Sequence, residues 1–187
     1  MRNVELKQSS GCGRELAGES EREAFAPCDK ELARARNAAY RFLTYRPRSS
    51  AEVEERLLEK GFTDVVVRTV FTDLVRLGYI NDHEFARQWA AARIRLQGFG
   101  RRRIERELRA KGIGREIIAE TLANFVSEDT ERKAAREAAQ KKLKTLQSVD
   151  RESRRRRLAG FLERKGFSYD VIRVVLTDAD EIQSTLL

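Results

Sequence analysis

An internal repeat is the feature that most constrains how this chain can fold. Three stretches align without gaps: VEERLLEKGFTDVVVRTVFTDL from Val53, IERELRAKGIGREIIAETLANF from Ile104 and LAGFLERKGFSYDVIRVVLTDA from Leu158, at offsets of 51 and 54 residues. Apolar residues fall at the same positions in all three stretches. A repeat of this length is typical of proteins in which small structural units are stacked in series.

The periodicity within each repeat predicts helices. Val53 and Leu57 are one helical turn apart, as are their equivalents. Each stretch then has a Lys-Gly pair, as at Lys60-Gly61, which is typical of a helix C-terminus with glycine in the left-handed conformation. Ser49 or Ser50 is expected to cap the second helix of the first repeat. VVVRTVF is β-branched and could form a strand, but its alignment with IIAETL favours a helix.

A further helix is expected before each aligned stretch, as in NDHEFARQWAAARIRL, where Asn81 or Asp82 supplies the cap. The sequence therefore predicts an all-α fold, an elongated solenoid of three tandem three-helix repeats. The expected repeats are residues 31–79, 80–126 and 127–187, the last with a short C-terminal tail. Residues 1–30 are rich in Gly, Ser and Glu without apolar periodicity, so we expect a disordered tail there.

The charge of the chain favours an anionic partner. Its net charge is +8, and because residues 1–30 hold 5 basic and 6 acidic residues, the positive charge belongs to the repeats. Nucleic acid or an acidic protein surface would complement it. No apolar run is long enough for a membrane helix, and the start does not resemble a secretory signal. The expected location is the cytoplasm, with no membrane contact.

The sequence shows no catalytic constellation. It lacks a phosphate-binding loop, and HEFAR, which begins at the single histidine His83, lacks the second ligand of a zinc motif. Cys12 and Cys28 are the only cysteines and are too few for a metal site. We therefore expect a binding protein rather than an enzyme, without metal or cofactor.

Clustered arginines are the candidate binding residues. Arg101–Arg103 align with Arg155–Arg157, whereas the first repeat has Ser50, Ala51 and Glu52 at these positions. Cations at a helix start oppose the helix dipole by about 0.3–1 kcal/mol each, so their repetition favours a function over a merely solvated surface. The predicted partner- or anion-binding set is Arg101, Arg102, Arg103, Arg106, Arg109, Lys111, Arg154, Arg155, Arg156 and Arg157.

The segments YRFLTYRPRSSAEVEERLLEKGF, LVRLGYINDHEFARQWAAARI and GFGRRRIERELRAKGI resemble those of the bacterial RecX regulatory proteins, in the order of that family. The resemblance implies a non-enzymatic regulator of RecA, the recombinase that forms filaments on single-stranded DNA. We expect the protein to be a monomer. Such a protein lies in the filament groove, where DNA is also within reach, and mostly inhibits RecA ATPase, recombinase and co-protease activity. The alternative is a helical protein that binds nucleic acid directly.

Overall fold

The protein is described by a computed structural model over residues 28–184, with side chains over residues 28–179. Within this range the chain forms helices and no strand, which confirms the all-α prediction. The helices are α1 (Asp29–Tyr45), α2 (Ser50–Glu59), α3 (Asp64–Arg76), α4 (Asp82–Ala92), α5 (Arg101–Ala110), α6 (Arg115–Phe125), α7 (Glu128–Leu143), α8 (Arg151–Lys165) and α9 (Tyr169–Ser184), with a π-helical segment at Arg93–Gln97. The predicted tail, residues 1–30, lies outside the described residues except for residues 28–30.

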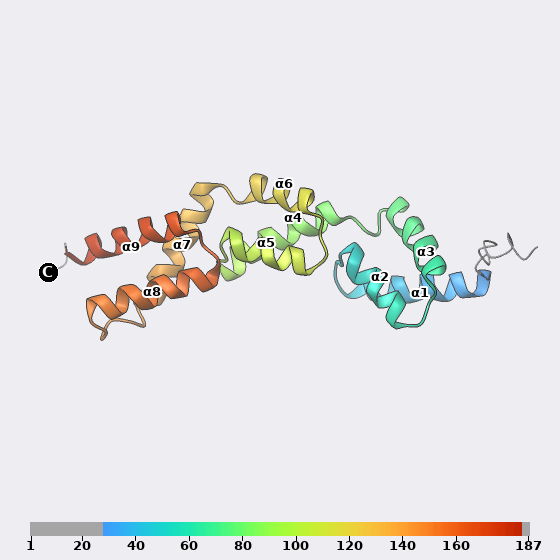
Figure 1. The fold of residues 1–187 in the computed structure, drawn as a ribbon, viewed down its shortest axis with the longest axis horizontal. Coiled ribbons are helices and arrows are strands. Elements are labelled where there is room, and N and C mark those ends of the chain that lie inside the picture. The colour runs from blue at the N-terminus through green and yellow to red at the C-terminus, as the bar shows by residue number, and fades with distance from the viewer. Residues whose placement is uncertain (1–27, 185–187) are drawn as a thin grey trace, which may run out of the picture.

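The helices form three successive groups along one long axis (Figure 1). Helices α1–α3 make the first repeat, α4–α6 the second and α7–α9 the third. Helices pack closely within their own repeat, and helices of different repeats share only isolated contacts. The predicted elongated array of three-helix repeats is therefore confirmed. The β-branched run Val65–Phe71 lies within α3, as the alignment favoured.

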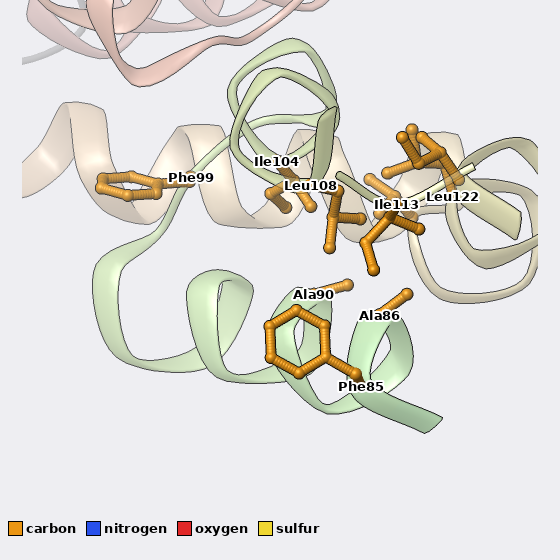
Figure 2. Packing of buried hydrophobic residues seen from close by; sticks show 10 residues of the cluster. Phe85, Ala86, Ala90, Phe99, Ile104, Leu108, Ile113 and Leu122 are labelled. Atoms are coloured by element: carbon orange, nitrogen blue, oxygen red, sulfur yellow. The ribbon is translucent and has the colours of Figure 1, made fainter. Parts of the chain in front are cut away.

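Each repeat has its own apolar core. Leu57, Leu108 and Leu162, which align in the sequence, are each at most 1% exposed, and each belongs to a different cluster of buried side chains. In the middle cluster, Leu108 of α5 points toward Ala90 of α4 and lies beside Ile113 (Figure 2). Because no cluster crosses from one repeat to the next, the contacts between repeats must be of another kind.

Local signals place the helix ends. The Ser49 hydroxyl accepts a hydrogen bond from the Glu52 backbone N–H, and the Glu52 carboxylate accepts one from the Ser49 N–H, a reciprocal cap. Asn81 caps α4 through the Glu84 N–H. The glycine of each Lys-Gly pair has a positive φ, between 73° and 86°.

The third repeat differs from the prediction at the start of its second helix. The alignment predicts a start at Arg155, but α8 begins one turn earlier, at Arg151. The cause is Asp150, whose carboxylate accepts a hydrogen bond from the Ser153 N–H at 2.9 Å. This bond, the first of several, holds the pKa of Asp150 below its usual range. The first two repeats have Tyr45 and Leu96 shortly before their second helices and lack this early cap.

Candidate functional site at the repeat junctions

The start of α5 meets the end of α8. The Gly100 N–H donates to the Lys165 carbonyl at 2.9 Å, and the Arg102 N–H donates to the Gly166 carbonyl at 3.0 Å. N–H groups at a helix start have no partner within their own helix, and carbonyls at a helix end are equally unpaired. The junction between the second and third repeats therefore joins the positive end of one helix dipole to the negative end of another.

Arg103 belongs to this junction. Its guanidinium lies 3.7 Å from the centre of the Phe99 ring and donates to the Arg164 carbonyl at 3.2 Å. The carbonyls at the end of α8 favour a nearby cation. The arginine therefore opposes the dipole of its own helix but complements that of the helix it contacts. Lys165 lies in the same region, where burial, followed by the charge of Arg103, lowers its pKa.

Arg101 and Arg102 remain exposed at the junction. The backbone N–H of Arg101 donates to the Glu131 carboxylate of α7 at 3.0 Å, and its guanidinium lies 3.5 Å from the Leu122 carbonyl. The Arg102 side chain makes no hydrogen bond or ion pair with the part of the chain that the structure describes. Both side chains are therefore open to an external anion, and that of Arg102 has no internal partner to give up.

The remaining candidates on α5 have different surroundings. Arg106 is exposed, and Arg109 is exposed but pairs with Glu105 at 2.7 Å. Lys111 is half-buried and pairs with Glu52 of the first repeat at 2.7 Å. Lys111 thus has an internal role at the first junction.

The third-repeat arginines lie away from those of α5. Arg154 is half-buried, and Arg155, Arg156 and Arg157 are exposed, in the first two turns of α8. The prediction that they stand at a helix start is wrong, because Asp150 extends the helix. At 1.5 Å per residue they lie roughly 15 Å along α8 from the junction that holds Arg103. The two arginine clusters are therefore separated along the molecule (Figure 1).

The first junction repeats the arrangement with different side chains. The Ser49 hydroxyl donates to the Lys111 carbonyl at 2.7 Å, and the Ser50 N–H donates to the Asp82 carboxylate at 2.8 Å. The start of α2 therefore lies on the end of α5, as the start of α5 lies on the end of α8. Glu52 completes this junction with ion pairs to Arg46, at 3.0 Å, and Lys111.

Glu52 makes the first junction sensitive to acid. Burial alone raises its pKa, but hydrogen bonds from Lys111, Arg46 and the Ser49 N–H outweigh burial, and the pKa lies below its ordinary value. The stabilisation is complete above the unfolded-state pKa, near about 4.3, and is lost as the pH falls through the folded-state value. We expect the stability difference between the natural chain and Glu52→Gln, measured by urea unfolding, to shrink as the pH is lowered from about 7 to about 3. Glu55→Gln, on an exposed residue of α2, should show no such trend.

Sequence reasoning missed Glu107, which connects α4 to α5. Its carboxylate accepts hydrogen bonds from the Trp89 indole at 3.1 Å, from Arg93 at 2.6 Å and from Arg103 at 3.4 Å. The helical i,i+4 spacing of Arg103 and Glu107 is the one sequence signal that points to part of this network. Trp89 stacks on Phe85 beside the middle core, as its helical phase predicts.

The described residues contain no cluster of His, Cys, Asp and Glu that could hold a metal ion. His83 is exposed and lies 3.4 Å from Glu120, and Cys28 is an exposed free thiol. No helix within the described range is long and apolar enough to cross a membrane. The junctions and their arginines thus remain the candidate site.

Comparison with known proteins gives matches along most of the chain. Family models described as the first, second and third three-helix domains of RecX match residues 35–74, 81–122 and 129–176. The regulatory protein RecX of Amycolatopsis mediterranei is 36% identical over 165 residues, which cover 86% of this chain and 93% of that protein. Its counterpart in Bacillus subtilis is 37% identical over 146 residues, 78% of this chain but 55% of that longer protein.

Solved structures show the same fold. The crystal structure of RecX from Lactobacillus salivarius superposes with a TM-score of 0.75 and covers 82% of this chain and 99% of that one, at 23% identity. A second crystal structure, of a regulatory protein RecX, gives a TM-score of 0.71 at 24% identity. The arrangement of three-helix repeats is therefore shared with both.

Proposed function

The chain belongs to the RecX family of regulatory proteins, and from this membership we propose that it binds the filament that RecA forms on single-stranded DNA. In this proposal it lies in the filament groove as a monomer in the cytoplasm and lowers RecA ATPase, recombinase and co-protease activity. It acts by binding and catalyses no reaction itself.

The linear order of the repeats is the observation that carries the proposal. Three similar units follow one axis, joined by two junctions of the same type (Figure 1). A partner that repeats along its own axis can contact such an array at several places, and the individual contacts then reinforce one another. A filament groove is a partner of this shape.

The exposed arginines supply the charge for that contact. Arg101 and Arg102 lie at the second junction and Arg155–Arg157 lie further along α8. Guanidinium groups bind phosphates and carboxylates with good geometry, and both are present in a protein–DNA filament. Spaced arginine clusters therefore suit a surface that follows an anionic groove.

We expect the purified protein to lower the rate of ATP hydrolysis by RecA on single-stranded DNA while having no ATPase activity itself. Replacing Arg101 by Ser and Arg102 by Ala should raise the concentration needed for half-inhibition several-fold. The plot of log affinity against log salt should become shallower by about 1.4 if both arginines contact phosphates of single-stranded DNA. Arg103 is kept because its side chain is part of the junction.

The matched control removes the same charge elsewhere. Arg68 of α3 and Arg173 of α9 are both exposed, and their double replacement by Ser and Ala should leave inhibition close to that of the natural chain. Equal losses in the two double variants would show that only net charge matters. An unchanged RecA rate at saturating protein would refute the proposal itself.

Direct binding to DNA is the second candidate, supported by the exposed arginines on α8. Helix α6, which occupies the place of a recognition helix, exposes only Arg115 and Asn124 as side chains of the kind that read bases, beside alanines and glutamates. Affinity for naked single-stranded DNA equal to that for the RecA filament would favour this candidate.

A further inference from the structure

Each repeat has the same type of surface at the end of its second helix. We define this end surface by the Lys-Gly pair after the second helix and an acidic residue in the first turn of the first helix. The three sets are Glu31, Lys60 and Gly61; Asp82, Lys111 and Gly112; and Glu131, Lys165 and Gly166.

The end surfaces of the second and third repeats are both covered by the start of a helix. The lysine carbonyl accepts a hydrogen bond from the N-cap residue, Ser49 or Gly100, and the acidic residue accepts one from the next backbone N–H. The glycine lies against the arriving helix. A Cβ atom on Gly112 would lie 2.3 Å from the Ala51 Cβ, and one on Gly166 would lie 2.3 Å from the Arg103 Cβ.

The end surface of the first repeat is not covered by any described residue. Gly61 has the same backbone conformation, with φ +82°, yet a Cβ added to it would meet nothing within 4 Å. A hollow of about 500 Å³ adjoins it, lined by Arg34, Asn37, Ala38, Arg41, Phe42, Tyr45, Arg56, Lys60 and Phe62. Tyr45 is 86% exposed.

Positive charge dominates this hollow. Four of its lining residues are cations and none is acidic. Arg34 and Arg41 make no ion pair with the described chain, and Arg56 pairs with Glu59 outside the lining. In the second repeat Glu107 stands at the position of Arg56, and its carboxylate accepts hydrogen bonds from Arg93 and Trp89. The hollow of the first repeat thus holds four cations and no carboxylate, so it favours a carboxylate supplied from outside.

The first junction shows how the start of a helix can supply such a carboxylate. Glu52 is the third residue of the helix that starts at Ser50, and it reaches across to the Lys111 ammonium at 2.7 Å. Lys60 is the equivalent of Lys111. A helix start with a small N-cap residue and an acidic third residue therefore complements both the glycine and the lysine of an end surface.

We propose that the uncovered end surface of the first repeat binds the first turn of a helix from a partner protein, with Ser, Thr or Gly at the N-cap and Glu or Asp at the third position. The partner helix places its N-cap against the Lys60 carbonyl and its carboxylate among Lys60, Arg56 and Arg41. This surface lies at the opposite end of the molecule from α8, so the proposal does not rest on the proposed binding to RecA.

The probe is a peptide that copies the helix start found at the first junction. A peptide of residues 46–60, cross-linked between positions 54 and 58 to hold the helix, is titrated into the full chain and followed by fluorescence anisotropy and by NMR of the labelled protein. We expect saturable binding below about 1 mM peptide, with shifts at Gly61 and Tyr45. The same peptide carrying Glu52→Lys should bind at least about tenfold more weakly.

Two glycine variants provide the matched test. Gly61 and Gly78 both have a positive φ and open space around the Cβ position, and asparagine tolerates this backbone conformation. We expect Gly61→Asn to weaken peptide binding at least about tenfold, because its side chain occupies the place of the arriving helix, and Gly78→Asn to leave binding unchanged.

Three results would overturn the proposal. The first is no binding, or equal binding to the Gly61→Asn and Gly78→Asn chains. The second is peptide binding that occurs only after residues 1–27 are removed. That result would show that residues 1–27, and not a partner protein, occupy the surface. The third is that Gly61→Asn weakens the binding of a thymidine oligonucleotide but not that of the peptide. That result would show that the surface binds nucleic acid.

Discussion

Replacing Leu108 by alanine should lower the free energy of unfolding by about 2–5 kcal/mol. Leu108 is fully buried in the middle core, where it packs with residues of α4 and α6. Removing its branched end leaves a cavity in a small cluster that receives no support from the cores of the neighbouring repeats. Urea unfolding followed by circular dichroism measures the loss.

Leu58→Ala is the matched control. Leu58 also lies within a second helix, but its residue is 46% exposed, so its replacement should change stability by no more than about 0.5–1 kcal/mol. A loss below about 0.5 kcal/mol for Leu108→Ala would contradict the burial of this residue and with it the alignment of the repeats.

Gly166→Ala should destabilise the protein by roughly 2–5 kcal/mol through the second junction. Alanine in the left-handed conformation costs about 1–2 kcal/mol, and Gly166 has φ +86°. The added Cβ would also lie 2.4 Å from the Arg103 backbone nitrogen, so α5 and α8 must separate, at a further cost of about 1–3 kcal/mol.

Gly61→Ala separates these two effects. Its φ is nearly the same, but nothing lies within 4 Å of the added Cβ, so only the backbone cost of about 1–2 kcal/mol is expected. Equal losses in unfolding free energy for Gly166→Ala and Gly61→Ala would show that the junction contributes little to stability.

The helices and their repeat could be predicted because their signals are local. Val53 and Leu57 are one turn apart, and the caps at Ser49 and Asn81 act over three residues. The same local logic explains the error in the third repeat. Alignment placed a helix start at Arg155, but Asp150 offers a stronger cap nearby and the helix begins there.

The junctions could not be predicted, because their contacts join distant residues through backbone atoms. Arg103 donates to a carbonyl 61 residues away, and the Gly100 N–H pairs with the Lys165 carbonyl. Backbone donors leave no mark on residue type, so the arginines of α5 could be recognised as unusual but not as neighbours of another helix end. Arg103 is in consequence partly structural, whereas Arg101 and Arg102 stay available as the predicted binding residues.

The separation of the three cores has a mechanical consequence. Each repeat is a stiff link, since its helices share one packed interior. Apart from the peptide chain that connects them, neighbouring repeats are held together by a few hydrogen bonds and ion pairs around Gly112 and Gly166. We therefore expect bending and twisting to be concentrated at the two junctions. A pulling force should separate neighbouring repeats at a junction before it opens any core.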